Sequence, residues 1–228
     1  MWKKSLIIIF LILIVDQVFK FWIKTNMTLG QEFHILGEWF ILHFTENEGM
    51  AFGFSFGGEF GKLVLSLFRI IAVVIIFFYL RDIIRKKEHP GLIISISLIL
   101  AGAIGNIIDS AVYGLIFSNS SYHTVATFLP EEGGYGTFLH GKVVDMLYFP
   151  IIEGHYPEWF PFWGGEDFIF FRPVFNIADS SITTGVMILI VFQRLFFPAK
   201  KEEESAIQKD EELTSPKQEE NADTPASL

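Results

Sequence analysis

Two aspartates, Asp145 and Asp179, are the residues of this sequence best suited to chemistry. Two carboxylates held within a few ångströms of each other cannot both ionise readily, so one of them keeps its proton. The ionised carboxylate can take a proton from water, and the protonated one can donate to a scissile carbonyl and later to a leaving amine. From the residues alone an alternative stays open, in which Asp179 only caps a helix and Asp145 only ends a strand.

Other reactive groups are scarce. The chain has no cysteine, which excludes disulfides, thiolate nucleophiles and cysteine metal sites. Its six histidines show neither HxH nor HExxH spacing. We therefore expect no metal site and no cofactor, and acid–base catalysis by carboxylates is the chemistry that the sequence favours.

The segments that position these carboxylates have the composition of a membrane protein. Hydrophobic residues make up 51% of the 228 residues, and only 19% are charged. A helix needs about 20 mostly apolar residues to cross a bilayer. Four stretches meet this condition and predict an α-helical membrane domain over residues 1–198, with spans at about 5–24, 62–81, 91–111 and 174–197.

The last segment, 199–228, has nine acidic and four basic residues, and thus −5 of the total net charge of −9. Such a composition is typical of disorder. We expect an acidic cytoplasmic tail there, with no fold and no chemistry.

Lysine and arginine positions predict the orientation, because cytoplasmic loops carry an excess of both. They precede the first span, follow the fourth, and fill the short connection between the second and third. The segment 25–61 has none, and the segment 112–173 has only Lys142 and Arg172. We therefore place both termini in the cytoplasm and these two long loops outside.

The outer loops contain signs of structure. Apolar residues alternate in 33–36 and 39–44, which favours short strands. The second loop is rich in aromatic residues, glycine and proline, which suggests either a folded cap at the level of the lipid headgroups or a poorly ordered loop.

Ionisable groups inside spans are expensive and mark either function or pairing. Asp16 and Lys20 lie four positions apart on one helix face, so they form either a local ion pair or, with Gln17, a polar patch that supports the edge of a site. Asn106 and Asp109 share a face of the third predicted span, which packing of the nearby glycines does not explain. Asn47 and Gly49 suit a tight turn in the first outer loop.

Taken together, these clusters resemble the lipoprotein signal peptidase (signal peptidase II) family. Five boxes occur in the family's order: Asp16-Gln17 with Lys20, Asn47-x-Gly49-x-Ala51-Phe52, Gly102-Ala103-x-Gly105-Asn106-x-x-Asp109, Val143-Val144-Asp145 and Phe175-Asn176-x-Ala178-Asp179. The resemblance covers residues 16–185 and the four-span layout.

The resemblance implies a bundle of four transmembrane helices with a small outward-facing β-cradle. It implies an aspartic endopeptidase of the bacterial inner membrane that cleaves prolipoproteins just before the diacylglyceryl-modified cysteine, at the periplasmic face. Asp145 and Asp179 would be the catalytic pair, and the family match assigns substrate-binding or supporting roles to Asn47, Gly49, Asn106, Asp109, Asn176, Ala178, Asp16 and Lys20. We expect prolipoproteins and membrane lipids as partners, no nucleic acid, and a monomer.

The sequence departs from the family pattern in the third box, which usually ends in Arg where this chain has Ser110. Lys142 or Arg172 would then provide the positive charge for the group with which that arginine pairs. The fourth box has Met146 where Phe is usual. The long outer stretches 112–140 and 151–172 are expected to form a lid or a partner surface. We further expect Asp179, inside the fourth span, to be the more buried aspartate and to hold the proton.

Two other classes of function remain. An ion-coupled transporter would use Asp16, Asp109 and Asp179, but the chain shows no internal repeat of the kind that transporters often have. A non-catalytic membrane scaffold would bind a partner through its outer loops.

Overall fold

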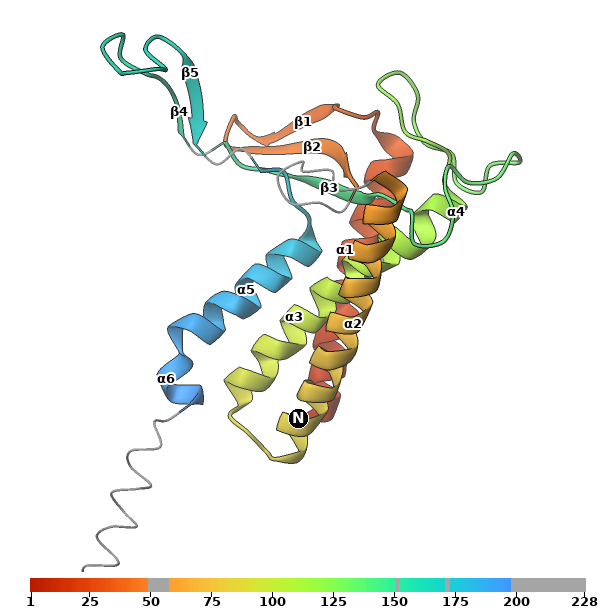
Figure 1. Cartoon of the computed structure of the whole chain (residues 1–228), viewed down its shortest axis with the longest axis vertical. Helices are drawn as coiled ribbons and strands as arrows, with labels where there is room; N and C mark the ends of the chain where they lie inside the picture. Colours follow the sequence, from red (N-terminus) through yellow and green to blue (C-terminus); the bar gives the residue numbers. More distant parts are fainter. Residues whose placement is uncertain (49–57, 151, 171–172, 198–228) are drawn as a thin grey trace, which may run out of the picture.

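The computed structural model describes residues 1–48, 58–150, 152–170 and 173–197. Within these ranges three helices are long and apolar enough to cross a membrane. They are α1 (Trp2–Asn26), α2 (Gly58–Arg85) and α3 (Pro90–Ile108), which continues through a π-helical turn η2 (Asp109–Tyr113) into α4 (Gly114–Ile116). The chain is therefore a helical membrane protein with a small sheet at one end of its helices (Figure 1).

Helix α1 has its charged side chains on the face toward the bundle and most of its large apolar side chains on the outward face. Its buried residues are Ser5, Asp16, Lys20, Ile23 and Lys24, while large apolar side chains such as Phe10 are exposed. Exposed apolar side chains are stable in lipid, whereas charged groups must turn inward to find partners. The first span therefore carries its charges to the interior of the helical bundle.

The glycines of α3 allow its neighbours to approach closely. A Cβ on Gly102 would lie 2.2 Å from the carbonyl oxygen of Ala178, and a Cβ on Gly105 would lie 2.8 Å from Oδ2 of Asp16. Small residues at such positions let membrane helices pack backbone to backbone. This packing brings α1 and α5 (Ile177–Val191) against the same stretch of α3.

The fourth apolar stretch differs from the single helix expected over 174–197. Helix α5 has 15 residues, and after Phe192 the chain forms the short helix α6 (Gln193–Phe196). Asn176 caps α5, so the helix begins only at Ile177. Phe196 folds back against His89, with ring centroids 5.2 Å apart, and joins the apolar cluster at the far end of the bundle. The apolar stretch thus breaks at Phe192, where φ is −103° and ψ is 17°.

A three-stranded antiparallel sheet covers the other end of the helices (Figure 1). Its order is β1 (Glu32–Leu36), β2 (Phe40–Asn47) and β3 (Val143–Tyr148). The first two strands agree with the alternation at 33–36 and 39–44. Strand β3 pairs Val144 with Glu46 and Asp145 with Thr45. Successive side chains point to opposite faces, so Asp145 and Glu46 lie on different faces of the sheet.

The long second outer segment has two parts. Residues 117–141 return over η2 and α4, held by backbone hydrogen bonds such as Gly136 N–H to Gly114 O at 2.8 Å. Strands β4 (Ile152–His155) and β5 (Asp167–Phe170) form a separate hairpin that projects beyond the sheet (Figure 1). Stacked aromatic rings, including those of Tyr156 and Phe160 at 5.1 Å, fill its tip.

Candidate active site

Two different elements bring Asp145 and Asp179 to the junction of the sheet and the bundle. Asp145 lies within β3 rather than at its end. Asp179 lies in the first turn of α5, where it forms a capping box with Asn176: each side chain accepts from the other residue's backbone N–H. Asp179 thus does cap a helix, as the simpler sequence interpretation allows, and it has a second set of contacts besides.

Asn176 joins the two aspartates. Its Nδ2 donates to Oδ1 of Asp145 at 2.7 Å, and its Oδ1 accepts from the backbone N–H of Asp179 at 2.9 Å. Asn176 is fully buried. Because one planar amide contacts both residues, the position of Asp145 is tied to the first turn of α5.

Asn106 extends this connection into the bundle. Its Nδ2 donates to Oδ1 of Asp179 at 2.8 Å, and its Oδ1 accepts from Nζ of Lys20 at 3.0 Å. The Lys20 ammonium lies 2.9 Å from Asp16 Oδ2 and 2.8 Å from Asp109 Oδ2, with all three side chains buried. The pair expected from the spacing of Asp16 and Lys20 is therefore part of a three-residue ion cluster.

This ion cluster holds the backbone immediately before each aspartate. Oδ1 of Asp16 accepts from the N–H of Ala178 at 2.9 Å, and Oδ2 of Asp109 accepts from the N–H of Val144 at 3.2 Å. Gln17 adds a bond to Oδ1 of Asp109 at 2.9 Å. These residues therefore hold the pair through its backbone, and the charge of Lys20 also lowers the pKa of Asp145.

The environment of Asp145 favours its protonated form. Burial raises its pKa to about 7, and the charge of Asp179 adds to the rise, while hydrogen bonds from Asn176 and Asn47 oppose it. Asp145 is 4% exposed, whereas Asp179 is only half-buried. The expectation that Asp179 is the more buried aspartate is wrong. Asp179 lies at the very start of α5, nearer the open end of the bundle, whereas the strand that carries Asp145 is covered on both sides.

The remaining site residues divide into two groups. Asn47, at the end of β2, bonds to Asp145. Ala178 is buried against α3, where its carbonyl oxygen faces Gly102. Gly49 lies outside the described residues, as does Arg172. Met146, in place of the usual Phe, packs fully buried in the apolar cluster beneath the sheet. Among the described residues no group of histidines and carboxylates is arranged to hold a metal ion.

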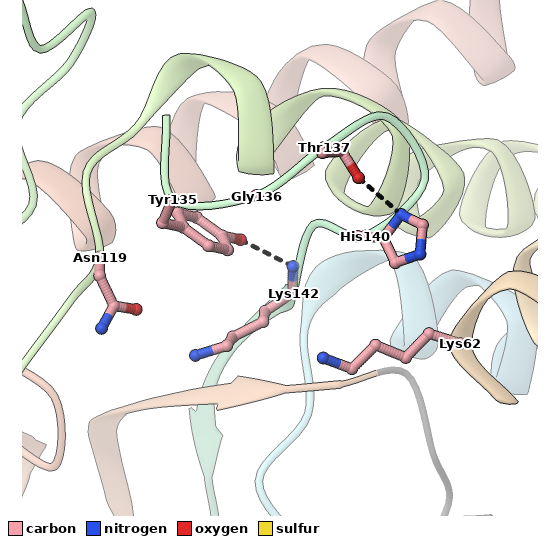
Figure 2. Close-up of a pocket in the computed structure, with 7 residues that line it drawn as sticks. All are labelled: Lys62, Asn119, Tyr135, Gly136, Thr137, His140 and Lys142. Carbon is pink, nitrogen blue, oxygen red and sulfur yellow. Dashed lines mark hydrogen bonds between the residues drawn. The ribbon is translucent and has the colours of Figure 1, made fainter. Parts of the chain in front are cut away.

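Lys142 does not face the two aspartates. Its ammonium lies 3.4 Å from Oε2 of Glu46 and points into a separate pocket on the other side of the sheet (Figure 2). Ser110 donates to the carbonyl oxygen of Asn106 at 3.2 Å. Lys142 immediately precedes β3 and pairs with Glu46, so the suggestion that it or Arg172 serves the partner of the missing arginine stays a prediction.

A cation that the sequence did not assign to the site, Arg69 of α2, does lie within electrostatic range of it. Asp179, Asp145 and Asp109 each attract its guanidinium. Spacings of three and four place it on the helix face of Ser66, whose hydroxyl donates to Leu139 O at 3.1 Å, and of Val73, which packs in the core. That face is the inner face of α2. The only sequence signal was a charge within an apolar span.

Fold and site together define a membrane protein whose buried polar network organises two carboxylates at one end of a helical bundle. Residues 8–196 match the family described as signal peptidase (SPase) II. The chain belongs to this family, so it is a peptidase, and the resemblance seen in the sequence motifs is confirmed.

Several curated relatives are similar over most of their length. The lipoprotein signal peptidase of Porphyromonas gingivalis is 55% identical over 185 residues, which are 81% of this chain and 80% of the relative. That of Amoebophilus asiaticus is 37% identical over 81% of this chain and 75% of its own. That of Chlorobium phaeobacteroides is 32% identical over 82% and 93%.

Two solved structures share the fold. A bacterial membrane enzyme determined by the in meso method at 2.3 Å resolution is 25% identical, with a TM-score of 0.55 over 96% of this chain and 95% of its own. A second, at 1.9 Å resolution, is 27% identical, with a TM-score of 0.54 over 86% and 95%.

Proposed function

We propose that this chain is an aspartic endopeptidase that removes signal peptides from diacylglyceryl-modified prolipoproteins, with Asp145 and Asp179 as its catalytic pair. The observation that carries the assignment is the bridge through Asn176, which contacts both aspartates while one of them, Asp145, has a pKa raised to about 7. A coupled pair with one proton at neutral pH has the acid and the base that amide hydrolysis requires.

In the proposed reaction Asp179, the more exposed aspartate, is the base that takes a proton from a water molecule. The water oxygen attacks the carbonyl carbon of the bond before the lipidated cysteine, while protonated Asp145 donates a hydrogen bond to the carbonyl oxygen. Transfer of the proton of Asp145 to the nitrogen then breaks the C–N bond and leaves Asp179 with the proton taken from water. The products are a signal peptide with a new carboxyl group and a lipoprotein with a free cysteine amine.

Arg69 adds a positive charge near this pair. The charge of Lys20 also acts on Asp145 and lowers its pKa, although its ammonium is held between Asp16 and Asp109. Arg69 interacts with Asp179 and Asp145 from the inner face of α2. Arg69 thereby adds to the positive charge that stabilises the pair.

The proposed setting is the bacterial inner membrane, with a monomeric chain that has both termini in the cytoplasm and the site at the periplasmic face. Four spans are proposed, with α5 and α6 as the fourth. Helix α5 alone is only about 22 Å long against a hydrocarbon core of about 30 Å. A short span is accommodated by local thinning of the bilayer. The substrate lipid can then stay in the membrane while the scissile bond reaches the aspartates.

The test is cleavage of a diacylglyceryl-modified prolipoprotein by purified protein in detergent, followed as a shift on a gel. Wild type should cleave, and Asp145→Asn and Asp179→Asn should be folded and inactive. Lys86→Gln, which changes an exposed residue just beyond α2, is the matched control and should cleave normally. Full activity in either aspartate variant would reject the catalytic pair, and a scaffold role would then replace it.

A further inference from the structure

A pocket of about 480 Å³ lies on the face of the sheet opposite Asp145 (Figure 2). Its lining residues come from the outer end of α2, from the long second outer segment and from the start of β3: Lys62, Asn119, Tyr135, Gly136, Thr137, His140 and Lys142. None of these is acidic. The ammonium groups of Lys62 and Lys142 and the amide of Asn119 extend into the same space (Figure 2).

The wall of this pocket is held rigidly. Tyr135 N–H donates to Phe117 O at 3.0 Å, and Gly141 N–H donates to Ser110 O at 2.8 Å. A Cβ on Gly141 would lie 2.2 Å from the carbonyl oxygen of Asp109, so the two backbones are in direct contact. The hydroxyl of Tyr135 accepts from the N–H of Lys142 at 2.7 Å and fixes the start of β3. The pocket wall is therefore held by backbone contacts, and the expectation that 112–140 form a lid or a partner surface stays a prediction.

The base of the pocket has more positive than negative charge. Glu46 is one carboxylate between two ammonium groups, Lys24 on Oε1 and Lys142 at 3.4 Å from Oε2. Burial alone would raise the pKa of Glu46, but the charges of Lys24 and Lys142 hold it below its ordinary value, so Glu46 is ionised. Its Oε1 also accepts from the Ser120 hydroxyl at 2.6 Å. The single negative charge of Glu46 is therefore shared by the ammonium groups of Lys24 and Lys142.

Lys62 adds a third ammonium group from the other side. Its carboxylate neighbour Glu48, at 3.3 Å, is half exposed, and water weakens such a pair. Two convergent lysines with amide and hydroxyl donors match a phosphate group, which lysine binds as a point charge. A carboxylate ligand would use fewer of these donors than the several oxygens of a phosphate can.

The position of the pocket indicates where such a group comes from. Lys62 is near the first turn of α2, and Asn119 follows the end of α4, so the pocket lies at the ends of two apolar spans. The phosphates of membrane lipids lie at this depth, and basic pockets beside spans bind anionic headgroups. The sheet separates the pocket from Asp145, since Glu46 and Asp145 lie on opposite faces.

We propose that this pocket is a phosphate-binding site, distinct from the catalytic site, that takes the headgroup phosphate of an anionic membrane lipid. The bound phosphate interacts with Lys62 and Lys142 and neutralises the charge that Glu46 leaves unbalanced. It thereby fixes the start of β3 to the outer end of α2. Binding needs no cleavage, so it is measured independently of the proposed peptidase activity.

The test is thermal unfolding of the full chain in detergent, with phosphatidylglycerol, phosphatidylcholine or inorganic phosphate added. A ligand bound only by the folded state raises the melting temperature. Phosphatidylglycerol should raise it by about 5 °C near saturation, and phosphatidylcholine should raise it much less. Lys62→Gln and Lys142→Gln should each bind phosphatidylglycerol about tenfold more weakly, whereas Lys62→Arg should bind nearly as wild type does.

Lys86→Gln is the matched control, because it removes one lysine charge from an exposed site at the opposite end of α2 and should respond as wild type. If Lys142→Gln does not fold, Lys62→Gln still decides the question. Stabilisation by inorganic phosphate alone would keep the phosphate site and replace its lipid source with a soluble one. Equal stabilisation by both lipids, or an unchanged response of Lys62→Gln, would overturn the proposal.

Discussion

The side-chain amide of Asn176 donates to Oδ1 of Asp145 at 2.7 Å while Asn176 also caps the helix that carries Asp179. Asn176→Ser keeps a good N-cap residue but loses the amide that reaches Asp145. We expect this variant to melt close to wild type and to have kcat lowered about 100-fold, since a small misplacement of reacting groups costs that much. Melting curves and cleavage rates measured on one preparation check this.

Asn176→Ala provides the comparison, because it removes the cap as well. It should lose the same activity and also about 1 kcal/mol of stability. If Asn176→Ser cleaved within a few-fold of wild type, Asn176 would be a helix cap and nothing more.

The pKa of Asp145, raised to about 7, predicts how activity depends on pH. If Asp145 must be protonated to donate to the scissile carbonyl, kcat/KM should fall as the pH rises through about 7. The measured values belong to the coupled pair rather than to Asp145 alone. A pH–rate profile of wild type between pH 5 and 9 measures this, and a flat profile up to pH 9 would contradict it.

The same raised pKa affects stability. Below the pKa of the unfolded carboxyl, Asp145 is protonated in both states, so the folded state loses nothing. As the pH rises toward about 7, only the unfolded state releases the proton, and stability falls. Asp145→Asn cannot titrate. The difference in melting temperature between wild type and Asp145→Asn should therefore change between about pH 4 and 7 in favour of the variant, and a constant difference would refute the assignment.

Several parts of this site could be predicted from sequence because they depend on spacing. The four-residue separation of Asp16 and Lys20 predicts their ion pair, and Asn176 three residues before Asp179 is the pattern of a capping box. The resemblance of the third motif to that of the family also predicted that Asn106 belongs to the site. These features are local or are fixed by family membership, so tertiary structure does not alter them.

Other features depend on contacts that spacing does not reveal. Helix α2 is apolar on nearly all sides, so its sequence does not show which way Arg69 faces. The packing of α2 on α3 determines the direction. Composition does not show that the apolar stretch 174–197 breaks at Phe192 into two helices. The phosphate pocket requires Lys62 and Lys142, 80 positions apart, to meet around an outer segment that has no motif.

Arg69 should support activity through its charge. Asp179 and Asp145 both attract its guanidinium, so its removal takes a cation away from the pair. Arg69→Gln should lower kcat/KM about tenfold, and Arg69→Lys should restore most of the wild-type rate. Arg81→Gln, an exposed arginine on the same helix, should cleave as wild type does. An equal loss of rate in Arg69→Gln and Arg69→Lys would mean that the charge of Arg69 has no role.

Lys20 should be more important to folding than either carboxylate that it contacts. Lys20→Met leaves Asp16 and Asp109 buried together without a cation, and breaking a buried ion pair in this way costs about 3–5 kcal/mol. We expect low yield and early melting from this variant. Lys3→Met, an exposed lysine at the start of α1, should behave as wild type.

The triple variant Asp16→Asn, Lys20→Met, Asp109→Asn tests the reason for that loss. Its asparagine oxygens can still accept from the N–H groups of Ala178 and Val144, while no buried charge remains. Replacing a whole buried ion cluster with neutral groups is often tolerated. The triple variant should therefore melt above Lys20→Met. If it melted lower, the buried charges themselves, rather than the two backbone hydrogen bonds, would be what stabilises this part of the bundle.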